Sequence, residues 1–562
     1  MTRAAAVFGA LLVATPLVSL LLTAATQPPD ALRALAGTVL GDALIQTVAL
    51  LGGIALLAGA LGTATAWAVT AYRFPGSRML AWLLPLPMAI PTYVTALVYV
   101  ELLDAAGPVR SALRSTLGRE VADLWFPEIR SLTACIALLS FVLYPYVFVA
   151  ARAAFLARGV ASLWAARTLG ASPGQAFLKV ALPLASRAIA AGLTLALLEA
   201  LNDVGATEYL GVRTLTVTVY TAWLARGDLA GATQIACVIL LAVVALLAAE
   251  AIFRRRRNYA VFPAGEHDTP VVVDGWKGSA LACACIFPVT IGFGVPCLFL
   301  IREVVRRDLV ASAGPDFQHH LAVTVGLAAA ATALILLWAI PIALGSRAHG
   351  SRTERILRFT AGLGYAVPGT VLVLGLFGPL AGVDRILAGE WFDVTGRDPG
   401  LLLIGSGAAV VVAYVIRFMR VGIGSLTAQL AGMSPAVEQA ARILGAGPLA
   451  LALRIQLPLL RPALLAAALL IFVDCLKELP ATLLLRPLNV ETLATLVYGA
   501  ASRGLFEEGA LAALLIVLAC LGPVIWLTGA AAPRTERMAI TGSVQAALRE
   551  TPSSATLKAA SV

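Results

Sequence analysis

Ionisable side chains interrupt two apolar stretches of the sequence. A charged side chain at the centre of a bilayer costs roughly 2.5–3.5 kcal/mol on insertion scales, so such residues normally face protein or water. A constant offset of 275 residues maps Glu199 onto Asp474 and Asp203 onto Glu478. Carboxylates in this arrangement could line a pathway and attract a hard cation, which prefers oxygen ligands. The candidate pathway residues are Glu199, Asn202, Asp203, Asp474, Lys477 and Glu478.

The same residues have a structural interpretation, which we favour. In it, Lys477 pairs with an acid across an interface within the protein and holds two parts of the chain together. If the helix that carries Glu199 begins near Arg187, Glu199 lies roughly 18 Å along it, near the middle of the bilayer. We expect no tightly bound metal in either interpretation, because a tight site would slow the release of a transported ion.

Two polar loops repeat in the same register. The segment Ala-Ala-Arg-Thr-Leu-Gly at 165–170 recurs as Ala-Ala-Arg-Ile-Leu-Gly at 440–445, and a Leu-Pro-Leu at 182–184 recurs at 457–459. Several matches at one offset predict an internal duplication. The loop residues with a candidate role are Ala165, Ala166, Arg167, Gly170, Pro183, Glu438, Ala440, Ala441, Arg442, Gly445 and Pro458.

Each loop has the composition of a short capped helix. Gly170 and Gly445 are expected to end it, because Gly tolerates the left-handed conformation of a helix C-terminus. In the second copy, Ser434 and Pro435 predict an N-cap and a first helical position, and Glu438 then falls in the favourable first turn. The prolines Pro183 and Pro458 are expected at or near the start of the next helix.

The candidate pathway and loop residues lie within or between long apolar segments, which must hold them in place. The chain of 562 residues is 60% hydrophobic and 13% charged, whereas soluble domains carry about 25% charged residues. A spanning helix needs about 20 apolar residues, and backbone groups in lipid must be satisfied internally. The sequence therefore predicts an all-α polytopic membrane protein, in which the first run is an uncleaved helix. The twelve expected spans are 5–25, 44–71, 79–104, 131–155, 187–212, 232–252, 278–301, 321–345, 358–384, 400–424, 463–486 and 509–530.

The duplication divides these spans into two parallel six-helix halves, since an even number of spans gives both halves the same orientation. We expect a first half over 1–252, a basic cytoplasmic linker over 253–277, a second half over 278–530 and a cytoplasmic tail over 531–562. The repeated loops then occupy 160–184 and 434–459.

The net charge of +10 fits a membrane orientation better than a nucleic-acid partner. Lys and Arg concentrate in cytoplasmic loops, and the run Arg254 to Arg257 would have to be exported if the N-terminus lay outside. We therefore expect both termini in the cytoplasm. The loop 105–130 conflicts mildly with this orientation, because it carries four arginines and would lie outside.

The repeated loops resemble the EAA loop of binding-protein-dependent ABC importer permeases, which reads Glu-Ala-Ala, three residues, Gly, and then Ile-x-Leu-Pro. Trp164 and Gln439 stand in place of the family's Glu. The resemblance implies a type I importer permease fold and a coupling helix that docks on a cytosolic ABC ATPase dimer. The chain has no G-x-x-x-x-G-K-[ST] motif with a hydrolytic constellation. We therefore expect a transport subunit without a cofactor, whose partner hydrolyses ATP-Mg.

Three segments, 87–94 followed by 102–109, 201–206 and 476–487, resemble the fused permeases of ferric iron importers, and the resemblance extends over about 40–530. It implies that ferric iron is delivered by a periplasmic or extracellular binding protein and crosses the inner membrane through this chain. Permeases for thiamine, phosphonate or other small solutes share much of this plan and remain alternatives. A secondary transporter also has twelve helices in two parallel halves, but it has no ATPase for a duplicated loop to bind.

Overall fold

The computed structural model describes residues 2–26, 36–117, 128–158, 166, 168–256, 270–348 and 352–530. Over these residues the chain is almost entirely helical, and eleven helices are long and apolar enough to span a membrane, or twelve if one bent pair is counted as a span. This confirms the predicted all-α polytopic fold. Most of the predicted linker 253–277 and the whole tail 531–562 lie outside the described residues.

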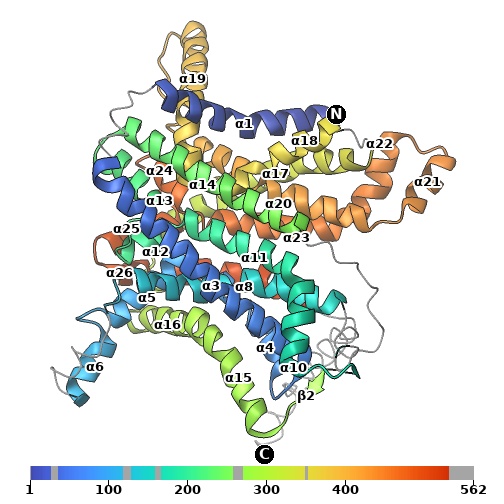
Figure 1. The fold of residues 1–562 in the computed structure, drawn as a ribbon. Coiled ribbons are helices and arrows are strands. Elements are labelled where there is room, and N and C mark those ends of the chain that lie inside the picture. The colour runs from blue at the N-terminus through green and yellow to red at the C-terminus, as the bar shows by residue number, and fades with distance from the viewer. Residues whose placement is uncertain are drawn as a thin grey trace, which may run out of the picture.

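The same series of helices occurs twice along the chain (Figure 1). We call residues 2–256 the first half and residues 275–530 the second half. The helices of the first half are α1 (Thr2–Thr26), η1 (Ala36–Leu40), α3 (Gly41–Ala71), α4 (Ser77–Leu83), η2 (Leu86–Ala89), α5 (Thr92–Leu103), α6 (Pro108–Leu117), α8 (Leu132–Arg158), α10 (Pro173–Ala176), η3 (Phe177–Ala181), α11 (Leu182–Asn202), α12 (Gly205–Tyr209), α13 (Leu215–Tyr220), η4 (Thr221–Ala225) and α14 (Leu229–Arg256).

The helices of the second half follow the same order, from α17 as the counterpart of α3 to α26 as the counterpart of α14. A short parallel strand pair, β1 (Tyr72–Arg73) with β2 (Val271–Val272), connects the first half to the segment before α15. The helices are α15 (Gly275–Val289), η5 (Thr290–Gly294), α16 (Val295–Arg306), α17 (Pro315–Ala348), α18 (Arg352–Ala361), η6 (Leu363–Ala366), α19 (Gly369–Thr395), α20 (Ala408–Gly432), α21 (Pro435–Ile443), α22 (Pro448–Ala450), η7 (Leu451–Gln456), α23 (Leu457–Leu476), α24 (Pro480–Leu485), α25 (Leu493–Ser502) and α26 (Phe506–Ala530).

The predicted spans 79–104 and 358–384 are wrong as single straight helices. In the first half the chain bends by 90° between Ser77–Ala89 and Thr92–Thr116. In the second half a short helix, η6, precedes α19, which begins only at Gly369. Proline causes both breaks, because it lacks an N–H and its ring clashes with the preceding turn. Pro91 and Pro368 stand at these two points with extended backbone.

The predicted spans 187–212 and 463–486 are shifted. Helical spans of the observed structure run from Pro173 to Asn202 and from Pro448 to Leu476. Pro183 and Pro458 do stand in the first turns of α11 and α23, as predicted. These helices, however, continue the shorter helices α10 and α22 through the π-helical segments η3 and η7.

The first span of each half packs against the other half. Helix α1 lies along α17, α18 and α19, whereas α15 and α16 pack against α3, α4 and α5. The backbones approach closely at glycines: a Cβ on Gly375 would lie 2.1 Å from the carbonyl oxygen of Pro16, and one on Gly292 would lie 2.3 Å from that of Phe141. Neither half therefore buries its helix faces alone, and the two form one body.

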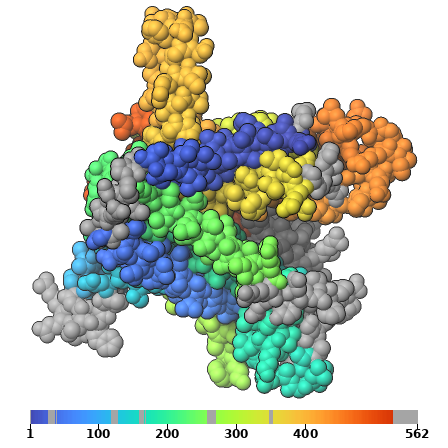
Figure 2. Space-filling model, turned by 45° about the horizontal axis from the view of Figure 1, so that its top comes forward, coloured from blue at the N-terminus to red at the C-terminus, as the bar shows by residue number. Residues whose placement is uncertain are grey.

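Helix α19 projects from the side of the bundle (Figures 1 and 2). The chain that follows returns to it, because the Asp384 carboxylate accepts hydrogen bonds from the N–H groups of Leu402, Leu403 and Ile404, at 3.1, 2.6 and 3.0 Å. The corresponding helix of the first half, α5, ends after 12 residues. The two halves thus differ in this region.

Candidate functional site

The first half has a helix break at Asp203. Helix α11 ends at Asn202, and the backbone of Asp203 is extended. The Asp203 carboxylate accepts a hydrogen bond from the N–H of Ala206 at 2.8 Å, and its carbonyl accepts one from the Thr207 hydroxyl at 2.8 Å. Asp203 is buried and supports the start of the short helix α12 by satisfying the N–H of Ala206.

The second half has the corresponding break at Glu478. Its carboxylate accepts hydrogen bonds from the N–H groups of Ala481 and Thr482, each at 3.0 Å, and from the Thr482 hydroxyl at 2.7 Å. It also pairs with Arg417 of α20 at 3.0 Å. The Glu478 and Arg417 side chains are only 1% and 7% exposed, so the pair is buried. Asp203 and Glu478 therefore occupy equivalent capping positions, which the offset of 275 had related.

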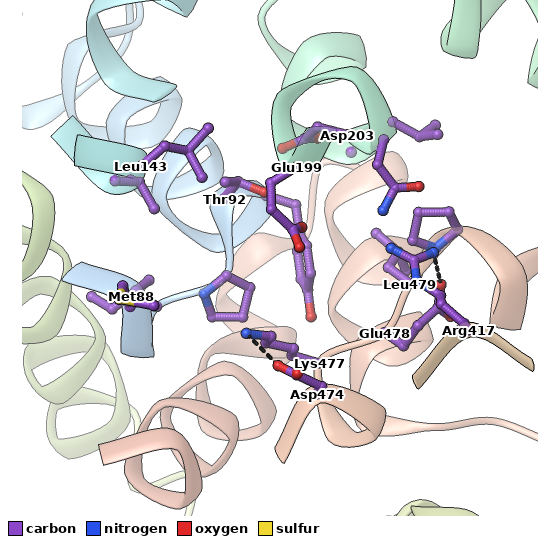
Figure 3. A pocket seen from close by; sticks show the side chains of 18 of the residues that line it. Met88, Thr92, Leu143, Glu199, Asp203, Arg417, Asp474, Lys477, Glu478 and Leu479 are labelled. Carbon is purple, nitrogen blue, oxygen red and sulfur yellow. Dashed lines mark hydrogen bonds and ion pairs between the residues drawn. The ribbon is translucent and has the colours of Figure 1, made fainter. Parts of the chain in front are cut away.

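A cavity of about 100 Å³ lies between the two breaks. Both halves contribute to it, and Glu199, Asp474 and Lys477 are half-buried at its wall. Figure 3 shows the Glu199 carboxylate turned into the cavity, between Asp203 on one side and the Lys477–Asp474 pair on the other. The six candidate pathway residues of the sequence are thus brought together at one place.

The prediction that Lys477 pairs with an acid across the interface between the halves is wrong. Its ammonium lies 2.9 Å from the carboxylate of Asp474, one turn earlier on the same helix. Contacts between the halves are made by other groups. The Tyr365 hydroxyl of η6 donates to Glu199 at 3.1 Å, and the N–H of Gly369 donates to the Asn202 side-chain oxygen at 2.8 Å.

The cavity wall is acidic. Four carboxylates and two basic side chains line it, which leaves a formal charge of −2. Arg417 and the bridging residues Tyr365 and Gly369 were not among the sequence candidates. Arg417 has a signal in the sequence, since it is the only charged residue in the apolar run 408–419. Gly369 follows Pro368 as Thr92 follows Pro91, so an alignment of the two proline breaks would have found it.

At one end of the bundle the halves meet through tyrosines. The Tyr209 hydroxyl donates to the Tyr498 carbonyl at 2.8 Å. The Tyr498 hydroxyl donates to the Glu208 carboxylate at 2.7 Å and lies 3.2 Å from the Tyr220 hydroxyl. We call these four residues the tyrosine contact. It lies at the end opposite to α10 and α21 (Figure 1).

The repeated loops form the opposite end. The Ser434 hydroxyl accepts from the N–H of Ala436, and Pro435 is the first residue of α21, as predicted. Gly445 has φ +82°, and Gly170 has φ +89°. Ala446 donates to the Ala441 carbonyl at 3.0 Å, which completes the glycine cap. Ala165 and Arg167 lie outside the described residues, and Ala166 is half-buried.

Apolar side chains at the tips of the loops have no cover. Leu169, Ile443 and Leu444 are 88%, 85% and 86% exposed. Glu438, in contrast, is buried, and its carboxylate accepts a hydrogen bond from the Gln456 amide at 3.0 Å. This bond ties α21 to the start of the span that follows. Figure 2 shows the segment around α21 standing out from the body of the molecule.

The chain matches known membrane components of transport systems. Residues 58–258 match the family model of the binding-protein-dependent transport system inner membrane component. The chain is 32% identical to the sulfate transport system permease protein CysT of Escherichia coli over 34% of its length and 67% of that protein. It is 30% identical to the molybdenum transport system permease protein ModB of Escherichia coli over 35% of its length and 85% of that protein. The chain therefore belongs to the family of binding-protein-dependent inner-membrane permeases.

A further match extends over both halves. The chain is 25% identical to the Fe(3+)-transport system permease protein FbpB 2 of Haemophilus influenzae, over 87% of its own length and 90% of that protein. This agrees with two permease units fused in one chain. The protein is thus a multi-pass inner-membrane permease subunit of an ABC importer.

Proposed function

We propose that the chain translocates ferric iron, delivered by an external binding protein, with ATP hydrolysed by a separate ATPase. The observation that carries the proposal is the acidic cavity between the two helix breaks, with a carboxylate from each half half-buried at its wall. Carboxylate and hydroxyl oxygens suit a hard cation, whereas sulfate or molybdate would be repelled by a formal charge of −2. The similarity to a ferric iron permease over most of both halves supports the same substrate.

The test is uptake in cells that lack this chain. We expect loss of radiolabelled iron uptake, restored by the wild-type chain, with sulfate and molybdate uptake unchanged. Unchanged iron uptake together with loss of sulfate, molybdate or thiamine uptake would contradict the proposal. A chain with Gly445→Asp serves as a matched negative control, because a side chain at φ +82° disturbs the repeated loop and leaves the cavity untouched.

We further propose that the tips of the repeated loops dock on an ATPase dimer and that the tyrosine contact faces the binding protein. This orientation places both termini in the cytoplasm, with the halves at 1–252 and 278–530, the linker at 253–277 and the tail at 531–562. Leu444 and Leu169 would be covered by the ATPase, because large apolar side chains this exposed at the tips of two loops favour an interaction site on each loop.

Co-purification tests the docking surface. Leu444→Asp should reduce the amount of ATPase recovered with the chain about tenfold or more, since a buried charge at an interface is strongly unfavourable. Leu488→Asp is the matched control, because Leu488 is also fully exposed but lies between α24 and α25, toward the tyrosine contact. Equal recovery of the ATPase with both variants would overturn the proposed docking role.

A further inference from the structure

We propose that Lys477 is a tethered counter-ion of the pathway. Its ammonium neutralises Asp474 while the cavity is empty, and an arriving cation displaces it and binds transiently to Asp474, Glu199 and the hydroxyl of Tyr93. When the cation leaves, Lys477 returns to Asp474. The proposal rests on the proposed function in one respect, that the cargo is cationic, and it explains how an acidic pathway can avoid holding its cargo tightly.

The four cavity carboxylates fall into two classes. Asp203 and Glu478 are buried and hold the helix breaks by accepting backbone N–H groups, and Glu478 also pairs with Arg417. Both oxygens of Glu478 and one oxygen of Asp203 are engaged by the fold, whereas the second oxygen of Asp203 is buried without a hydrogen-bond partner in the described part of the chain. Glu199, in contrast, accepts its hydrogen bond from a neutral hydroxyl, that of Tyr365. Glu199 therefore stands at the cavity wall without an ion-pair partner among the residues that the structure describes.

An independent observation points to a ligand in this cavity. Tyr93 lines the cavity and is 4% exposed, and its hydroxyl is buried with no hydrogen-bond partner in the described part of the chain. A buried polar group without a partner costs about 1–3 kcal/mol. A bound cation, or water carried with it, would satisfy the phenol oxygen as it passes.

The two basic side chains of the cavity differ in their freedom to move. Arg417 is held in a fully buried pair, and its planar guanidinium is fixed against Glu478. The Lys477 and Asp474 side chains are 27% and 21% exposed, and the ammonium sits at the end of a flexible four-carbon stem. Figure 3 shows this pair facing the cavity opposite Glu199. Because both side chains are partly exposed at the cavity wall, the Lys477 ammonium can move away from Asp474 without entering the apolar interior.

The electrostatic consequence follows from the charges. Without Lys477 the formal charge of the cavity wall changes from −2 to −3. One unit of charge at roughly 5 Å and an effective dielectric constant of about 20 changes the affinity for a cation by at least tenfold. A cation should then remain in the cavity instead of passing through it.

Metal retention by the purified complex tests the proposal. The complex of the full chain with its ATPase is placed in lipid nanodiscs, incubated with Fe(III) citrate or with redox-inert Ga(III), desalted and analysed by mass spectrometry for metal. We expect Lys477→Met and Lys477→Gln to retain at least tenfold more metal than the wild type, and Lys477→Arg to retain nearly as little as the wild type. Adding Glu199→Gln to Lys477→Met should abolish the gain.

Two results would overturn the counter-ion role: equal retention by the wild type and by both uncharged variants, in complexes that remain monodisperse and thermally stable, or retention by Lys477→Met that is insensitive to Glu199→Gln. The proposed function is tested separately, by measuring whether the wild-type chain restores iron uptake in cells that lack it. Normal iron uptake with no gain in retention would reject the counter-ion alone. A gain in retention in a chain that does not restore iron uptake would reject iron as the cargo alone.

Discussion

The two helix breaks perform the same task with different chemistry. In the first half, Asp203 holds the break by accepting the N–H of Ala206, and the residue that corresponds to Arg417 is Val142. In the second half, Glu478 does so with a buried arginine at 3.0 Å. The duplication has therefore preserved a position, a carboxylate that begins a short helix after a break, while the electrostatic environment of that position has changed.

A second difference follows from the first. A Cβ on Gly369 would lie 2.5 Å from the Arg417 guanidinium, so the second half requires glycine where the first half has Thr92. The N–H of Gly369 also donates to Asn202, whereas Lys477, the counterpart of Asn202, pairs with Asp474 of its own helix. The halves are thus asymmetric at linked positions, and one half could not replace the other.

The largest expected effect comes from breaking the buried pair. Arg417→Met leaves Glu478 charged and unpaired, which should cost about 3–5 kcal/mol of unfolding free energy. Denaturant unfolding in mixed micelles measures this. Arg417→Met combined with Glu478→Gln should recover most of the loss, because both charges are then removed. A single variant as stable as the wild type would show that the pair does not hold the second break.

Gly369→Ala should cost about 1–3 kcal/mol, because the added methyl displaces the guanidinium. The same measurement applies, and Thr92→Ala in the first half is the matched control with a smaller expected loss. The penalty should shrink in the background of Arg417→Met with Glu478→Gln, since the clashing group is then absent. An undiminished penalty there would mean that the glycine is required for another reason.

Asp203→Ala tests the weaker break. The loss of a capping carboxylate costs about 0.5–2 kcal/mol, so the destabilisation should be smaller than that of Glu478→Ala, which also strands Arg417. The two variants are compared by their unfolding midpoints. If Asp203→Ala destabilised the protein more than Glu478→Ala, the first break would depend on its carboxylate more than the second break does.

The smallest expected effect concerns the tyrosine contact. Tyr498→Phe removes the hydroxyl that donates to Glu208, a loss of about 1 kcal/mol. Because this contact joins the halves, we expect basal ATPase activity of the complex without binding protein to rise roughly fivefold. Tyr72→Phe, in β1 far from the contact, is the control. An unchanged basal ATPase rate would show that the tyrosine contact does not restrain ATP hydrolysis.

Local patterns in the sequence determined much of this protein. Hydropathy located most of the membrane spans, because lipid requires apolar helices about 20 residues long, but it missed the proline breaks and the early starts of two spans. The offset of 275 paired Asp203 with Glu478, and those two residues occupy equivalent positions. Ser434 and Gly445 act at the ends of α21 as expected, since capping depends on neighbours a few residues away.

Tertiary structure alone decided the partners. Whether Lys477 pairs within its helix or across the halves depends on which groups lie near it in space, and Asp474 is nearer than any acid of the first half that the structure describes. Arg417 finds Glu478 across 61 residues, and α1 crosses to helices more than 300 residues away. Sequence patterns record the local preferences of the backbone and of the solvent, whereas contacts between distant segments exist only once the helices are packed.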